Sequence, residues 1–291
     1  MFTFACEQSL SDEEFRLFRE CIHSHCGIDF DVGSKYLLEK RLALRLAALG
    51  IPSFLDYYQY LRFSRNRDQE MMDIMDILTV NETYFFRESL QLKAFTEEII
   101  PELIRAKSKQ GMHTLRIWSA GCSTGEEPYT IAMLLLEIAE LKGWQVEIVG
   151  SDISQRVLRQ ARNGVFCASS FRVTDNHYLQ RFFRKQDDCF RINDEVRQRV
   201  SFSHVNLFDT ERVAMLGRMD LVFCRNVIIY FDLEARKKVV DSFYRTLTGG
   251  GFLLLGHSES LMNIATQFTL RHFKNDMIYQ KPEGSIPGGQ P

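Results

Sequence analysis

The spacing of apolar positions divides the chain into two parts with different periods. Up to about residue 78, apolar residues recur every three or four positions, as Leu38 and Leu42 do within a predicted helix of residues 34–49. Gly50 follows that helix directly and is predicted to end it, because glycine readily adopts the left-handed conformation of a helix C-cap. The first part of the chain is therefore expected to be all helical.

The second part, after about residue 111, alternates apolar runs of strand length with helical segments. This alternation predicts an α/β domain with a mostly parallel sheet and helices on both of its faces. Residues of about 176–202 break the pattern and predict a small β-hairpin inserted into the sheet domain. The predicted strands of the large sheet are 115–120, 146–152, 200–207, 219–226 and 251–256.

Composition narrows the classes of protein that fit this pattern. Of the 291 residues, 45% are hydrophobic and 25% are charged, and the net charge is -2, so no global field attracts nucleic acid or an anionic membrane. No apolar run approaches the roughly 18 residues needed to span a bilayer. The seven cysteines are odd in number and lack a CxxC pair, which favours reduced thiols in a cytoplasmic protein and predicts no metal site.

A glycine-containing loop between a predicted strand and helix is the first candidate binding site. Gly121 and Gly125 allow backbone to approach a ligand closely, and the helix that follows opens with Glu126 and Glu127. Two carboxylates would repel a phosphate but suit a ligand that carries a cationic amino group and a sulfonium. The two glutamates could equally serve the helix dipole, and the spacing leaves both interpretations open.

Polar residues at the predicted strand ends extend this candidate site. Asp152 ends the next strand, where an acidic side chain can accept hydrogen bonds from ribose hydroxyls or can cap the following helix. Arg225, Asn226 and Tyr230 follow a later buried strand, and ligands of open α/β sheets bind beyond the carboxyl ends of strands. Arg87 lies between the two parts of the chain, where ligand clefts are common.

Five motifs in this order resemble the CheR-type chemotaxis receptor methyltransferases, over about residues 10–281. The resemblance implies a Rossmann-like class I methyltransferase domain with a small β-subdomain, preceded by an all-helical domain. It also implies S-adenosylmethionine as the cofactor, and glutamates on the cytoplasmic helices of chemoreceptors as the substrate. The motifs are NETYFFR (81–87), WSAGCSTGEEPYT (118–130), GSDIS (150–154), FCRNVIIYF (223–231) and GHSES (256–260).

The resemblance implies a domain organisation and a role for individual residues. A receptor-recognition domain is expected at 1–78, a linker that contributes to the cofactor cleft at 79–95, the cofactor-binding domain at 96–282, and a disordered tail at 283–291. Arg87 and Tyr230 are the implied catalytic residues. The implied cofactor-binding residues are Asn81, Thr83, Arg87, Gly121, Glu126, Glu127, Asp152, Asn206, Leu207, Arg225 and Asn226.

Receptor docking is expected to use a basic face made of Lys40, Arg41 and Arg45, although these residues could equally form a solvated helix face. The short predicted hairpin turn at 186–189 lacks a glycine-rich extension, so we expect an enzyme that does not depend on a receptor's C-terminal pentapeptide. It is expected to be a monomer.

Three alternatives stay open from the sequence. The same fold could methylate another protein or a small acid, because the cofactor motifs do not specify the acceptor. A non-catalytic module that binds the cofactor for signalling is disfavoured by Arg87, Glu127 and Tyr230. A nicotinamide dehydrogenase is disfavoured because GEEP stands where G-x-G-x-x-G is expected.

Overall fold

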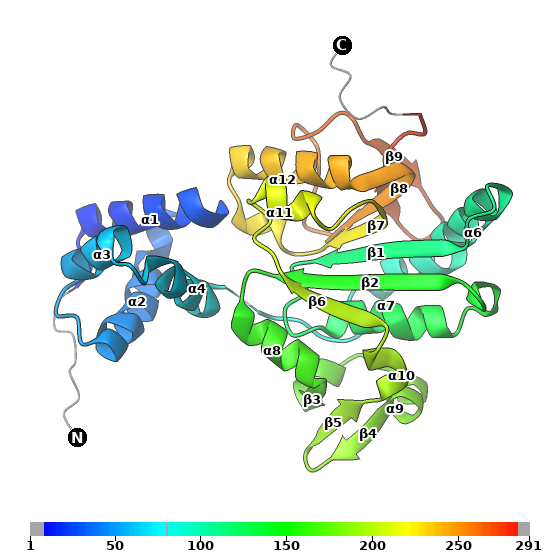
Figure 1. Cartoon of the computed structure of the whole chain (residues 1–291), viewed down its shortest axis with the longest axis horizontal. Helices are drawn as coiled ribbons and strands as arrows, with labels where there is room; N and C mark the ends of the chain where they lie inside the picture. The colour runs from blue at the N-terminus through cyan, green and yellow to red at the C-terminus, as the bar shows by residue number, and fades with distance from the viewer. Residues whose placement is uncertain (1–8, 80, 285–291) are drawn as a thin grey trace.

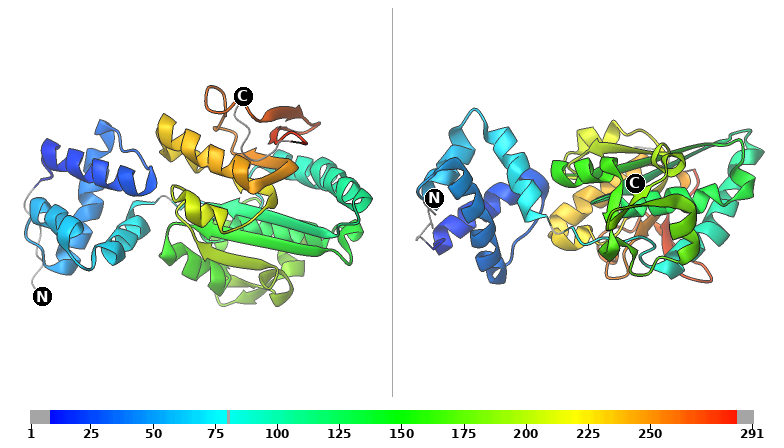
Figure 2. Two further views of the ribbon diagram at one scale, coloured as in Figure 1. Left: turned by 45° about the horizontal axis from the view of Figure 1, so that its top comes forward. Right: turned by 90° about the horizontal axis from the view of Figure 1, so that it is seen from below.

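The computed structural model describes residues 9–79 and 81–284 of the chain. Most of the tail predicted at 283–291 therefore lies outside the described residues. A helical domain at the N-terminus is joined to a larger sheet domain, and the views of Figures 1 and 2 agree that it lies at one end of that domain. Within residues 9–79 and 81–284, no helix is both long and apolar enough to cross a membrane.

Four α-helices form the N-terminal domain, together with a short 3-10 helix (Val32–Ser34), and the last of them ends at Leu78. They are α1 (Asp12–Cys26), α2 (Lys35–Leu49), α3 (Phe54–Phe63) and α4 (Arg67–Leu78). Ser11 caps α1 in a reciprocal pair with Glu14, and Gly50 ends α2 at φ 66°. The apolar stripe of α2 is confirmed, because Leu38 and Leu42 are fully buried in the core of this domain.

A seven-stranded sheet forms the centre of the second domain, in the order β6-β2-β1-β7-β8-β10-β9. The first five strands of this order pair in parallel, and β10 pairs antiparallel with both β8 and β9. Because β2 lies on one side of β1 and β7 on the other, the direction of winding reverses at β1, where such sheets bind ligands. The strands are β1 (Thr114–Ala120), β2 (Gln145–Asp152), β6 (Val200–His204), β7 (Met219–Cys224), β8 (Leu247–Leu255), β9 (Thr269–His272) and β10 (Met277–Gln280).

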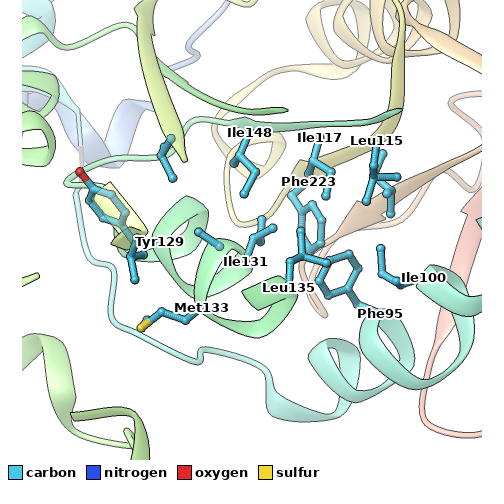
Figure 3. Close-up of a cluster of buried hydrophobic side chains, with 14 of the residues drawn as sticks. Phe95, Ile100, Leu115, Ile117, Tyr129, Ile131, Met133, Leu135, Ile148 and Phe223 are labelled. Carbon is cyan, nitrogen blue, oxygen red and sulfur yellow. The ribbon is translucent and has the colours of Figure 1, made fainter. Parts of the chain in front are cut away.

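Two hydrophobic cores lie on opposite faces of this sheet, because successive side chains of a strand alternate between faces. Ile117 of β1 belongs to one core and Trp118 to the other. Figure 3 shows the first core, in which Ile131 and Leu135 of α7 (Glu126–Leu136) pack beneath the strands. The second core is covered by α12 (Leu233–Thr246). The prediction of a sheet with helices on both faces is thus confirmed.

Several further helices connect the strands. The main chain leaves the helical domain through residues 79–88 and enters α5 (Ser89–Ala94), a π-helical turn (Phe95–Ile99) and α6 (Ile100–Lys109). Helix α5 thus begins within the segment 79–95 that is predicted as a linker. The remaining helices are α8 (Gln155–Asn163), α9 (Asn176–Phe182), α10 (Asp194–Arg197) and α11 (Thr210–Ala214).

A separate three-stranded sheet corresponds to the predicted hairpin insertion, and Figure 1 shows it at the lower edge of the sheet domain. Strands β4 (Phe183–Gln186) and β5 (Cys189–Ile192) form the hairpin. Strand β3 (Val165–Cys167) pairs with β5, so this small sheet begins before the expected boundary of about 176.

The prediction that every cysteine is reduced is wrong for two of them. Cys167 of β3 lies directly opposite Cys189 of β5, and the two form a disulfide. Cysteines opposite each other in an antiparallel pair are close enough to bond, and the sequence separation of 22 residues conceals this. Four other cysteines in the described residues are free: Cys21, Cys26, Cys122 and Cys224.

Arg45, one of the three residues expected to dock a receptor, is committed to the helical domain itself. Its guanidinium donates to both oxygens of Glu70, at 2.8 and 2.7 Å, and to Asp73 at 2.7 Å. Glu70 is 3% exposed and also accepts a hydrogen bond from Tyr57. Arg45 therefore neutralises a buried carboxylate between α2 and α4, and the structure corrects its predicted role as a free docking cation.

We expect Arg45→Met to lower the free energy of unfolding by about 2 kcal/mol, because it leaves the Glu70 carboxylate buried without its cationic partner. Chemical denaturation of the purified protein measures this loss. Lys40→Met, on the exposed side of the same helix, is the matched control and should change stability by less than about 0.5 kcal/mol. Equal effects of the two substitutions would contradict the structural role of Arg45.

Candidate active site

A cavity of about 260 Å³ lies where the helical domain meets the carboxyl ends of the parallel strands. Its sheet-domain wall comes from the loops after β1, β2, β6 and β7, which is the position expected for a ligand of an open α/β sheet. Its other wall comes from the helical domain, which ends at Thr79, and from residues 81–87. Ten of the eleven residues implied to bind the cofactor lie around this cavity: Asn81, Thr83, Arg87, Gly121, Glu127, Asp152, Asn206, Leu207, Arg225 and Asn226.

Asp152 holds two cavity loops together. One carboxylate oxygen accepts from the backbone N–H of Ser123 and the other from that of Ser154, each at 2.9 Å. Ser154 itself caps α8 through its side chain, so Asp152 is not the helix cap that the sequence left open. Burial raises the pKa of Asp152, while its backbone hydrogen bonds act in the opposite direction. Each oxygen keeps a further lone pair for a ligand hydroxyl.

Glu127 presents a partly buried carboxylate on the same wall. It accepts from the Ser119 hydroxyl at 2.6 Å and lies 3.4 Å from the guanidinium of Arg225. Burial raises the pKa of Glu127, and the charge of Arg225 opposes this shift. Arg225 is also paired with Glu88 at 3.2 Å, so one cation is shared by two carboxylates. This wall therefore favours a ligand that brings positive charge.

Glu126, the eleventh residue, lies outside the cavity lining, and its contact with the cofactor stays a prediction. Its carboxylate accepts from the hydroxyls of Thr124 at 2.6 Å and Ser170 at 2.9 Å. It is 2% exposed, and burial raises its pKa. Of two adjacent residues at the start of a helix, only one can face the cavity, and here Glu126 ties the helix to the segment after β3.

Glu259 of the GHSES motif fixes the loop after β7. Its carboxylate accepts backbone N–H groups of Asn226, Val227, Ile229 and Gly256, at 2.7 to 3.2 Å. This loop carries several cavity residues, among them Asn226 and Tyr230. Nothing in the sequence pairs Glu259 with residues thirty positions earlier.

Asn226 has a polar side-chain atom that a ligand could satisfy. Its side-chain oxygen is buried without a hydrogen-bond partner in the structure, although it lies at the cavity wall. Its backbone is left-handed at φ 59°, a strained conformation for a residue other than glycine. Ser123, across the cavity floor, shares this conformation at φ 49°. Strain of this kind is typical of loops shaped for a ligand.

The two residues implied to be catalytic both line the cavity. Arg87 donates from its guanidinium to the carbonyl of Glu82 at 3.1 Å and lies 5.6 Å from the centre of the Tyr84 ring. Tyr230 is 37% exposed, at the mouth of the cavity. Its carbonyl accepts from the N–H of Asp29, which links the loop after β7 to the helical domain.

Further contacts fasten the two domains around the cavity. Asn206 donates to the carbonyl of His25 at 2.7 Å, and Ile28 forms an isolated antiparallel bridge with Phe231. On the other side, Asp76 of α4 accepts from the Ser154 hydroxyl at 2.6 Å. The cavity is therefore closed by elements from both domains.

The three predicted docking residues have separate environments. Lys40 is exposed, and Arg41 lines the cavity and donates to the carbonyl of Leu78, whereas Arg45 is held in the ion pair described above. Glu82 and Tyr84 are among the cavity residues that were not identified from the sequence, because their positions beside Arg87 carry no periodic signal.

The chemistry of this wall fits S-adenosylmethionine. The carboxylates of Glu127 and Asp152 suit an amino group and ribose hydroxyls, and the unpaired oxygen of Asn226 can accept a hydrogen bond from a ligand donor. Gly121 (φ 76°) gives the first loop its tight turn, because an added Cβ would lie 2.5 Å from a methyl group of Val227.

Known proteins resemble this chain over almost its full length. Residues 13–79 match the CheR methyltransferase all-alpha domain, and residues 81–276 match the CheR methyltransferase SAM binding domain. Chemotaxis protein methyltransferase 2 of Vibrio cholerae is 39% identical over 94% of each chain. A chemotaxis protein methyltransferase of Borreliella burgdorferi is 36% identical over 86% of this chain and 88% of its own, and chemotaxis protein methyltransferase 1 of Pseudomonas aeruginosa is 34% identical over 94% and 99%. With both of its domains matched, this chain belongs to the CheR methyltransferase family, whose larger domain binds S-adenosylmethionine.

Proposed function

We propose that this protein transfers methyl groups from S-adenosylmethionine to glutamate side chains of chemoreceptors, giving γ-methyl esters and S-adenosylhomocysteine. The names of the relatives support chemotaxis as the process. One observation carries the proposal. The same cavity has a wall rich in carboxylates and an arginine, Arg87, that can bind an acidic substrate. Because receptor methylation sites lie on cytoplasmic helices, the proposal implies a cytoplasmic enzyme.

The substrate carboxylate needs little chemical activation. Bound S-adenosylmethionine supplies a methyl group already activated by its positively charged sulfur. A glutamate carboxylate has an ordinary pKa of about 4.3 and is ionised at neutral pH, so the enzyme needs no general base. The task left to the chain is to orient the carboxylate and to remove its water.

Arg87 and Tyr230 are placed to perform this task. The guanidinium of Arg87 lies on the cavity wall, outside the ion pair of Glu127 and Arg225, and can hold a carboxylate through charge-assisted hydrogen bonds. Tyr230 lies at the mouth of the cavity, where it can position the acceptor and limit the entry of water.

Labelled S-adenosylmethionine and receptor cytoplasmic fragments test the proposal. We expect incorporation of label that base treatment releases as methanol, because γ-glutamyl methyl esters are base-labile. Receptor fragments in which the methylation-site glutamates are replaced by alanine are the control and should remain unlabelled. Label that appears only on small acids or on unrelated proteins would support the alternative acceptor and contradict this proposal.

Docking of the receptor is proposed to use Lys40 and Arg41 of α2. Lys40 is exposed, and Arg41, the next residue of α2, lines the cavity. Attraction of these cations to acidic receptor helices weakens with salt, so Lys40→Glu should raise the KM for receptor fragments at low ionic strength. Unchanged KM would leave Lys40 as part of a solvated helix face.

We also propose that docking does not require a receptor's C-terminal pentapeptide. Only Asp187 and Asp188 lie between β4 and β5 in the turn of the small hairpin. This turn is too short to form an extended loop that could bind a peptide. Receptor fragments with and without their last five residues should therefore be methylated at equal rates. A rate that falls severalfold without the five residues would overturn this part of the proposal.

A further inference from the structure

The ring of Tyr84 lies next to two arginines at the cavity. The guanidinium carbon of Arg172 is 3.8 Å from the ring centre, and that of Arg87 is 5.6 Å away. Tyr84 and Arg87 line the cavity, while Arg172 comes from the segment between β3 and α9 and is half-exposed. Cation–π contact with a shared ring thus places a second cation beside the arginine expected to hold the substrate carboxylate.

Glu82 connects the same two arginines. Its carboxylate accepts from Arg172 at 2.8 Å, and its backbone carbonyl accepts from Arg87 at 3.1 Å. The hydrogen bond and the charge of Arg172 lower the pKa of Glu82, with a smaller contribution from Arg87. A carboxylate is therefore already bound at this position, and it belongs to the protein itself.

The ion pair between Glu82 and Arg172 can exchange easily. The side chains are 69% and 47% exposed, and exposed ion pairs of this kind contribute little to stability. An acidic substrate that docks at the cavity mouth can therefore displace Glu82 from Arg172 at small cost.

We propose that Arg172 binds a second carboxylate of the substrate, one helical turn from the glutamate that is methylated, and that Glu82 occupies this site when no substrate is bound. The inference rests on the proposed function and specifies its substrate class as a helix with paired acidic residues. Residues three or four positions apart on a helix have Cβ atoms about 5–6 Å apart, and they lie on the same face. Two carboxylates with this spacing can reach two guanidiniums that share one ring.

Three synthetic helical peptides test the proposal, each with one acceptor glutamate in the same alanine-rich frame. The first has a second glutamate four positions away, the second has glutamine there, and the third has the second glutamate two positions away, on a different face. We expect the wild-type KM to be about threefold to fivefold lower for the first peptide than for the other two. Arg172→Gln should abolish this difference and leave the affinity for S-adenosylhomocysteine unchanged.

Two further variants distinguish a binding site from a general charge effect. Glu82→Gln removes the internal competitor and should lower the KM for the first peptide. Arg184→Gln, an exposed arginine on β4, is the matched control and should keep the preference of the wild type. A preference that survives Arg172→Gln, or a raised KM in Glu82→Gln, would overturn the inference while leaving the proposed function intact. Absence of transfer to every peptide and to receptor fragments would overturn the proposed function, and the inference would fall with it.

Discussion

Replacing Arg87 by alanine is expected to lower the rate of methyl transfer by about 10²–10³-fold, the loss typical when a charged group that orients reacting atoms is removed. Affinity for S-adenosylhomocysteine should change by less than about threefold. The reason is the position of Arg87, which lies on the cavity wall but makes no ion pair with the acidic residues expected to hold the cofactor. Single-turnover rates and calorimetric titrations measure the two quantities separately.

Arg87→Lys is the informative companion variant. It keeps the positive charge but loses the planar fork that binds a carboxylate through two parallel hydrogen bonds, so it should restore only part of the rate. Equal losses of rate and of cofactor affinity in Arg87→Ala would contradict the assigned role and would place Arg87 in the cofactor site instead.

Replacing Asp152 by asparagine is expected to weaken binding of S-adenosylhomocysteine by about 10²-fold or more. Each carboxylate oxygen of Asp152 accepts a hydrogen bond from a backbone N–H group. In asparagine an NH2 group replaces one oxygen, so a donor would face one of these N–H groups. The substitution therefore disturbs the loop at Ser123 and removes acceptors available to a ligand. Isothermal titration calorimetry measures the loss, and Asp188→Asn in the exposed hairpin turn is the matched control.

The pH dependence of binding provides a second measurement of the same site. Burial raises the pKa of both Asp152 and Glu127, so on acidification these carboxylates become protonated at a higher pH than ordinary carboxylates do. Cofactor affinity should be complete above these raised pKa values and should fall as the pH decreases through them. Asp152→Asn should show a shallower decrease, and identical pH profiles in both proteins would contradict the role of Asp152.

The sequence predicted the features that depend on local chemistry and on strand order. Asp152, Arg225 and Asn226 were predicted to face one cleft because they follow parallel strands whose carboxyl ends meet at one edge, and the structure places them there. The helical domain was predicted from the period of residues such as Leu38 and Leu42, which the structure buries.

The remaining features depend on contacts between segments that are distant in the sequence, and local patterns do not predict such contacts. Glu126 and Glu127 are equivalent in sequence, and only the path of the segment at Ser170 determines which of them turns away from the cavity. In the sequence Arg45 resembles a surface cation, and only the packing of α4 against α2 shows that it pairs with Glu70. The pairing of Cys167 with Cys189 likewise depends on the register of the small sheet.

The division of the cavity between two domains has a thermodynamic consequence. The domains meet through a few contacts at its rim, among them the bridge between Ile28 and Phe231 and the hydrogen bond from Ser154 to Asp76. A ligand that touches both walls binds only the assembled pair, so its binding energy adds to the cohesion of the two domains. Saturation with cofactor or product should therefore raise the melting temperature and make the two domains unfold together.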